Sequence, residues 1–112
     1  MAKCLVLYRA ARSAEEQMGS GTPEQAQAGM DAWMAWAGKA GSALADLGAP
    51  LGSPKAVENG LSANGGGHIG GYSIIEAGSM DEALKMLEGH PHLMTPGGAA
   101  TTVHEFLAMP GQ

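Results

Sequence analysis

The sequence predicts a single α+β domain over residues 1–112, with strands and helices in the order β-α-β-β-α-β. Three observations support this prediction. Short apolar runs suit strands, two segments have helical spacing after clear start signals, and turns rich in glycine and proline separate them. This order is typical of the ferredoxin-like fold, an antiparallel sheet with two helices on one face. A chain of 112 residues is long enough to bury a core.

The first half of the chain predicts one strand and one long helix. Lys3–Arg9 is an apolar run too short for a helix, and it suits a strand covered on both faces. We expect a loop over residues 10–21. Thr22-Pro23 then supplies a helix cap and a proline at the first helical position. Apolar residues at intervals of three and four continue this helix to about Leu47, before Gly48-Ala49-Pro50.

The second half predicts three strands and a second helix. Ala56–Asn59 is expected to form a short strand between two turns. Gly71–Ala77 is rich in β-branched and aromatic residues and predicts the third strand. Ser79 with Glu82 forms a capping box, which starts a helix from Met80 to about Glu88. The last strand is expected over Thr101–Ala108.

Composition excludes several classes of partner. The net charge is −5 and the six basic residues are scattered, which argues against a nucleic-acid ligand. The single cysteine, Cys4, cannot form an internal disulfide, which favours a reducing compartment. We find no signal peptide and no apolar stretch of about 18 residues, so the expectation is a cytoplasmic protein without membrane contact. No motif points to a metal or to a cofactor.

The predicted strands are apolar on both of their faces. Leu5 and Leu7 alternate with Val6 and Tyr8, and Ile75 follows directly on Ile74. A sheet with one face in water alternates apolar with polar residues more cleanly. Two helices cover only one face, so we expect a second copy of the chain on the other. The sheet face therefore predicts a homodimer, with a monomer as the alternative.

Six segments of the chain together resemble one family. They are Lys3–Tyr8, Met30–Trp36, Gly70–Ala77, Ser79–Ala83, His90-Pro91 and Val103–Phe106. The chain resembles the YCII-related family, including its DGPF branch, and the resemblance spans nearly the whole length. It implies a dimeric α+β barrel with a cleft between sheet and helices, and no settled reaction. Some relatives are suspected enzymes, in which a His near the start of the first helix works beside an Asp. This chain has Thr22-Pro23 and no His at that helix start, and it has His90-Pro91 where those relatives have Asp-Pro after the second helix.

Three residues are candidates for acid–base chemistry. His90 follows the second predicted helix, and His68 lies in a glycine-rich loop before a strand. Glu105 is a carboxylate in a largely apolar strand and is the candidate general base. The alternatives are structural. A histidine near a helix end interacts favourably with the last carbonyl groups, and a glycine-rich loop is commonly a plain surface loop.

Three aromatic residues are candidates for ligand contact. Trp36 lies at the edge of the apolar stripe of the first predicted helix, while Tyr8 and Tyr72 are strand aromatics. Core packing is the alternative for each of them. The sequence thus leaves three functions open: binding of a small molecule in a cleft, acid–base catalysis of a lyase or hydrolase type, and a non-catalytic interaction module.

Overall fold

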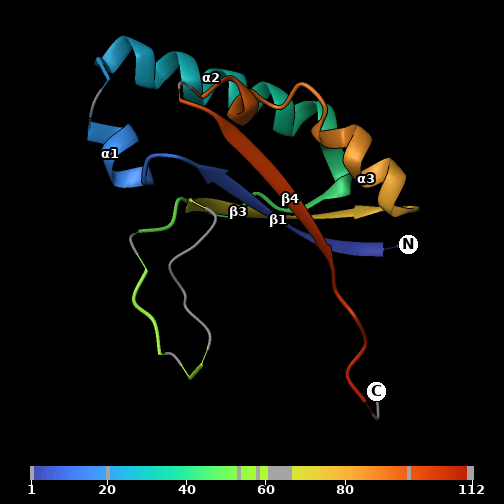
Figure 1. The fold of residues 1–112 in the computed structure, drawn as a ribbon. Coiled ribbons are helices and arrows are strands. Elements are labelled where there is room, and N and C mark those ends of the chain that lie inside the picture. Colours follow the sequence, from blue (N-terminus) through green and yellow to red (C-terminus); the bar gives the residue numbers. More distant parts are fainter. Residues whose placement is uncertain are drawn as a thin grey trace.

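The structure is a computed structural model that describes residues 2–19, 21–52, 54–57, 59–60, 67–95 and 97–110. It confirms the predicted α+β fold: a four-stranded antiparallel sheet in the order β2-β3-β1-β4, with the main helices on one face (Figure 1). The strands are β1 (Ala2–Ala10), β2 (Leu44–Asp46), β3 (His68–Ala77) and β4 (Ala99–Glu105). The helices are α1 (Ala14–Gly19), α2 (Pro23–Ala40) and α3 (Met80–Leu87), with short 3-10 turns η1 (Gly41–Ala43) and η2 (Pro91–Met94).

The central strand β1 organises the core. It pairs with β3 on one side and with β4 on the other. Its alternate residues Cys4, Val6 and Tyr8 are at most 2% exposed and face the helices. Ile75 of β3 lies opposite Cys4 and is fully buried on the same face. The core is therefore a single layer between the sheet and the two longer helices.

Helix α2 begins as predicted and ends earlier than predicted. The Thr22 hydroxyl accepts from the Gln25 N–H at 3.1 Å, and the Gln25 side chain accepts from the Thr22 N–H at 2.9 Å. The helix stops at Ala40 because Gly41 takes a positive φ of 58°, which turns the chain out of the helix. The prediction that this helix reaches Leu47 is wrong.

The second strand of the sheet is β2, so the prediction of a strand at Ala56–Asn59 is also wrong. Val57 is fully exposed there and Asn59 lies in a bend, while residue 58 is outside the described part of the chain. Leu44, which continues the helical spacing of α2, instead lies opposite Ile75 and packs against the core. A local preference for strand does not form one without a partner strand beside it.

Residues 10–21 include a short helix where a loop is predicted. The Ser13 hydroxyl accepts from the Glu16 N–H at 3.1 Å and starts α1. Helix α3 begins at its predicted position, since the Ser79 hydroxyl accepts from the Glu82 N–H at 3.2 Å. The Glu82 carboxylate accepts from the Gly78 N–H rather than from the Ser79 N–H. The second hydrogen bond of the predicted capping box is therefore made one residue earlier in the chain.

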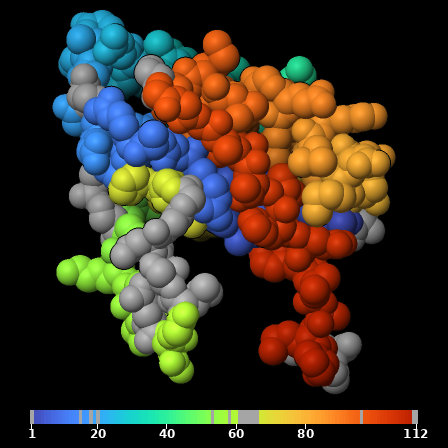
Figure 2. All heavy atoms as spheres, viewed as in Figure 1, coloured from blue at the N-terminus to red at the C-terminus, as the bar shows by residue number. Residues whose placement is uncertain are grey.

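The sheet face opposite the helices carries apolar residues that are only partly buried. They are Leu5 and Leu7 of β1 with Tyr72 and Ile74 of β3, and we call them the bare face. None of the described helices lies over it (Figure 1). The C-terminal residues 106–110 and residues 54–57 project from the body (Figure 2). Among the described residues, no helix is long and apolar enough to cross a bilayer.

Candidate functional site

Five aromatic and histidine rings meet between the sheet and the helices. Tyr8 comes from β1, Trp33 and Trp36 come from α2, and His90 and His92 flank Pro91 at η2. The Tyr8 ring centroid lies 4.8 Å from that of Trp33 and 5.0 Å from that of His90. The His90 centroid lies 4.6 Å from Trp33 and 4.3 Å from Trp36. We call these five residues the ring cluster.

Local structure explains why the five side chains converge. Trp33 and Trp36 are three residues apart on α2 and share the face toward the sheet. Gly89, with φ of 74°, ends the α3 segment and turns the chain inward. The His90 N–H then donates to the Leu87 carbonyl at 3.1 Å, which fixes the turn that buries its ring.

Tyr8 is held in a chain of hydrogen bonds at the sheet side of the ring cluster. Its hydroxyl donates to the Ser73 hydroxyl at 2.8 Å, and Ser73 donates to the Leu47 carbonyl at 2.6 Å. Burial raises the pKa of Tyr8, against a smaller opposing effect of the Ser73 hydrogen bond. The Tyr8 phenol is therefore protonated at neutral pH, and its proton is used in the hydrogen bond to Ser73.

His90 is fully buried, and one of its ring nitrogens has no polar partner. Its Nδ1 accepts from the His92 backbone N–H at 3.0 Å, so in the neutral ring the proton is on Nε2. Nε2 has no hydrogen-bond partner among the described residues. Burial, with a smaller effect of the charge of His92, lowers the pKa of His90 to about 4. The site thus contains a neutral imidazole that offers one unused N–H.

The aromatic rings around His90 explain how this N–H is tolerated. The plane of Trp33 stands at 87° to that of His90, and the plane of Trp36 at 63°. Such edge-to-face packing lets an N–H approach an aromatic face, which is a weaker acceptor than an oxygen. A ligand oxygen would be a better partner for Nε2 than these rings are.

His92 has a structural role in the ring cluster. Its Nε2 lies 2.8 Å from the Arg9 carbonyl oxygen, which can only accept, so Nε2 carries the proton. The hydrogen bond joins η2 to β1 and holds the backbone N–H that His90 uses. Among the described residues, no group of three or more His, Cys, Asp or Glu side chains is placed to hold a metal ion.

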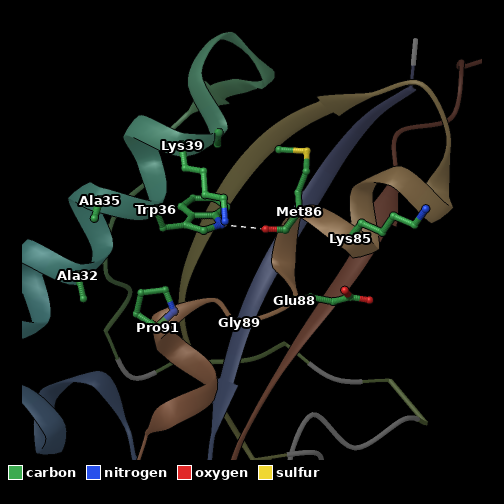
Figure 3. Close-up of a pocket in the computed structure, with 10 residues that line it drawn as sticks. Ala32, Ala35, Trp36, Lys39, Lys85, Met86, Glu88, Gly89 and Pro91 are labelled. Carbon is green, nitrogen blue, oxygen red and sulfur yellow. Dashed lines mark hydrogen bonds between the residues drawn. The ribbon is translucent and has the colours of Figure 1, made fainter.

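A hollow of about 370 Å³ opens at the surface between α2, α3 and η2 (Figure 3). Trp36 lines it, and the indole N–H donates to the Met86 carbonyl at 2.9 Å, which ties α2 to α3. Lys39 and Trp36 both project toward Met86, whereas Lys85 and Glu88 extend away from Trp36 (Figure 3). The lining residues are Ala32, Ala35, Trp36, Lys39, Ala40, Lys85, Met86, Glu88, Gly89 and Pro91.

Trp36 therefore belongs to both features. One part of its indole packs against His90 and another part lines the hollow, while only 8% of the residue is exposed. Gly89 and Pro91, the chain neighbours of His90, also line the hollow. Trp36 thus contacts the buried imidazole and also lines the open hollow.

The structure brings three of the six predicted site residues together, namely Tyr8, Trp36 and His90. Tyr72 lies on the bare face, because it pairs with Leu7 and points away from Tyr8. His68 begins β3 opposite Ala10, outside the ring cluster, and residues 65 and 66 of the preceding glycine run lie outside the described residues.

Glu105 lies at the far end of β4. It pairs with Cys4, whereas Tyr8 pairs with Thr101, four residues along β1. That separation corresponds to roughly 13 Å along the strand. Burial and the nearby Glu105 charge both raise the pKa of the Cys4 thiol. The charge of Glu105 thus affects the pKa of Cys4, and its carboxylate is not paired with His90.

Sequence reasoning missed several residues of this region. Trp33 is one of them, and its i, i+3 spacing with Trp36 could have indicated its place beside His90. Ser73 is a polar residue on the buried side of β3 and could have been recognised as a partner for a core hydroxyl. Lys39 and Met86 come together only through the packing of α2 on α3, for which the sequence carries no local signal.

Comparison with known proteins supports the fold. No protein-family model matches the chain, and no protein of curated function matches it significantly. Among solved structures, the chain is similar to 5-chloro-2-hydroxyhydroquinone dehydrochlorinase from Burkholderia phenoliruptrix, in complex with 2,5-dihydroxybenzoquinone. The match has a TM-score of 0.53 and 22% sequence identity, and it covers 93% of each chain. The shared property is the α+β fold.

Proposed function

We propose that this protein binds a small, flat organic molecule in the hollow between α2, α3 and η2, as a YCII-related protein. One observation carries the proposal: Trp36 lines an open hollow of about 370 Å³ while its indole also packs against the buried His90. That volume is at the small end of the range usual for ligand pockets. The related fold of an enzyme in complex with a dihydroxybenzoquinone agrees with a ligand of this size.

Tryptophan fluorescence tests the proposal directly, because both tryptophans of the chain lie in the ring cluster. A panel of small aromatic compounds should contain members that change the emission and raise the melting temperature in a saturable way. A panel without any such member would refute the proposal.

Two matched variants show whether binding occurs in the hollow. Ala35 is exposed and lines the hollow, so Ala35→Leu should fill part of it and weaken binding about tenfold or more. Ala28 is an equally exposed alanine of the same helix that does not line the hollow. Ala28→Leu should bind like the parent. Equal affinities of the two variants would place the ligand elsewhere.

Acid–base chemistry is a second candidate function, and it is favoured by the unpartnered Nε2–H of His90 among the described residues. A neutral imidazole in this state acts as a hydrogen-bond donor to a substrate oxygen rather than as a base. Titration of a bound compound followed by imidazole ¹⁵N chemical shifts tests this role. A ligand that reaches His90 shifts its Nε2 resonance, and ligands that bind without this shift would exclude the role.

We further propose that the bare face pairs with the bare face of a second copy. The chain is a slab with principal extents of 49 × 40 × 18 Å, and its radius of gyration is 15.2 Å, against about 13 Å for a compact domain of this length. Paired slabs would cover Leu5, Leu7, Tyr72 and Ile74. Light scattering should then report twice the 11.3 kDa of one chain, and 11.3 kDa at micromolar concentration would refute the dimer.

A further inference from the structure

The hollow gathers positive charge in a protein that is negative overall. The chain has six Lys and Arg residues against eleven Asp and Glu, with a net charge of −5. Two of the six basic residues, Lys39 and Lys85, line this one hollow. They come from different helices, so the fold rather than the sequence brings them to the same place.

Both lysines are free of partners among the described residues. The ion pair found in the described part of the chain joins Arg12 and Glu16, on α1 and its approach. Neither Lys39 nor Lys85 forms a hydrogen bond or an ion pair with a described side chain. Their charges are therefore available to a ligand.

Three backbone oxygens at the end of α3 that could repel an anion already accept hydrogen bonds. The end of α3 would normally present free carbonyl groups and a partial negative charge. Here the Met86 carbonyl accepts from Trp36, the Lys85 carbonyl accepts from the Glu88 N–H, and the Leu87 carbonyl accepts from the His90 N–H. Of the charged side chains that line the hollow, two are cations and one is a carboxylate.

The carboxylate is Glu88, which reduces the positive charge without cancelling it. It extends away from Trp36, as Lys85 does, whereas Lys39 projects on the same side as the indole (Figure 3). A flat ligand against Trp36 would therefore meet Lys39 first. The ammonium group of Lys39 thus offers a hydrogen-bond donor on the indole side of the hollow.

We propose that the hollow selects flat organic anions, with the ring against Trp36 and the anionic oxygen beside Lys39, while Lys85 adds a second positive charge to the lining. This inference rests on the proposed function and adds the charge of the ligand to it. Three probes of nearly equal shape test it: benzoate, benzamide and benzamidine, which are negative, neutral and positive. Their affinities are measured by fluorescence titration and calorimetry on the full chain.

Benzoate should bind tightest and benzamidine weakest. Benzoate affinity should fall as salt rises from about 20 mM to about 500 mM, while benzamide affinity should hardly change, because salt screens exposed charges. Lys39→Gln should weaken benzoate about two- to fivefold and leave benzamide unchanged, as expected for one exposed ion pair. Glu88→Gln should strengthen benzoate binding by a similar factor.

Lys55→Gln is the matched control, since Lys55 is an exposed lysine that does not line the hollow. It should leave benzoate affinity as in the parent. Equal affinity for the three probes, or equal effects of Lys39→Gln and Lys55→Gln, would overturn the charge preference while the proposed binding function stands. Failure of every probe, together with failure of the wider aromatic panel, would overturn both.

Discussion

His90 combines burial, a fixed tautomer and a low proton affinity in one residue. Its Nδ1 is occupied by the His92 backbone, and the rings of Tyr8, Trp33 and Trp36 surround it. Protonation would place a charge among aromatic rings, with no counter-ion beside it among the described residues. The folded state therefore favours the neutral ring, whereas in the unfolded chain the pKa of His90 has its ordinary value.

This difference predicts that stability falls with acid between pH 6.5 and about 4. The pKa of His90 is about 4 in the folded state against an ordinary value of 6.5, so the unfolded chain binds more protons in this window. The free energy of unfolding should fall by up to about 3 kcal/mol across this window, and none of it is lost through His90 above pH 6.5. Urea unfolding at several pH values measures the slope.

His90→Phe should flatten this dependence, because phenylalanine keeps a ring and cannot titrate. Tyr8, which packs against the His90 ring, and His92, whose backbone N–H donates to it, are the titratable neighbours and are present in both proteins. His104→Gln at an exposed site of β4 should keep the parental slope. A parental slope in His90→Phe would contradict the assignment of the proton effect to His90.

At the residue scale, the sequence could single out Tyr8, Trp36 and His90 but could not show that they meet. Tyr72 illustrates the reason. Alternation puts Tyr8 and Tyr72 each on one face of its own strand, but only the register of β1 on β3 decides whether the two faces coincide. The register pairs Tyr8 with Gly71, and Tyr72 therefore faces the other way.

At the scale of elements, α2 is a helix whose only buried residue is Trp36. Residues 23–32 are all exposed, so little packing supports this half. Start signals predicted both long helices correctly, because caps are local interactions. The end of α2 and the location of β2 were predicted wrongly, because pairing of Leu44–Asp46 with β3 overrides the helical spacing there.

Two glycine substitutions should have opposite effects on stability. Gly29 is in the exposed interior of α2, and an added Cβ would meet nothing within 4 Å, so Gly29→Ala should stabilise the fold by about 0.5–1 kcal/mol. Gly48 has φ of 82°, and a Cβ there would lie 1.7 Å from the Tyr72 carbonyl oxygen. Gly48→Ala should therefore destabilise it by more than about 3 kcal/mol.

Urea denaturation midpoints of the two variants measure both effects. A neutral result at Gly48 would mean that the turn after β2 does not approach Tyr72 closely in solution. A loss of stability at Gly29 would mean that an added Cβ there does not point into open space in solution.

At the scale of the whole molecule, the bare face and the hollow are on opposite sides of the slab. A dimer through the bare face would therefore leave the hollow open to solvent. The sequence predicted the apolar character of both sheet faces, because alternation of side chains is readable without coordinates. The hollow itself was not predictable, because its walls come from α2, α3 and η2.

Ile74→Glu should convert the proposed dimer into a monomer. Ile74 is a central residue of the bare face, opposite Leu5, and a carboxylate buried between two apolar faces is strongly unfavourable. Ala28→Glu adds the same charge at an exposed position of α2 and should keep the parental mass. Light scattering and circular dichroism are measured together, so that loss of the dimer is separated from loss of the fold. A folded Ile74→Glu protein with parental mass would contradict the interface.

The place of β1 at the centre of the sheet has a consequence for how the chain is made. The hydrogen bonds of β1 reach Ser73 across 65 residues and Thr102 across 93 residues. The ribosome therefore synthesises the apolar strand β1 long before its neighbours β3 and β4. The sheet can be completed only after β4 has been synthesised. Folding dominated by such distant pairings is slow, and an unpaired apolar strand invites aggregation. During synthesis, we expect β1 to be the segment to which a chaperone binds.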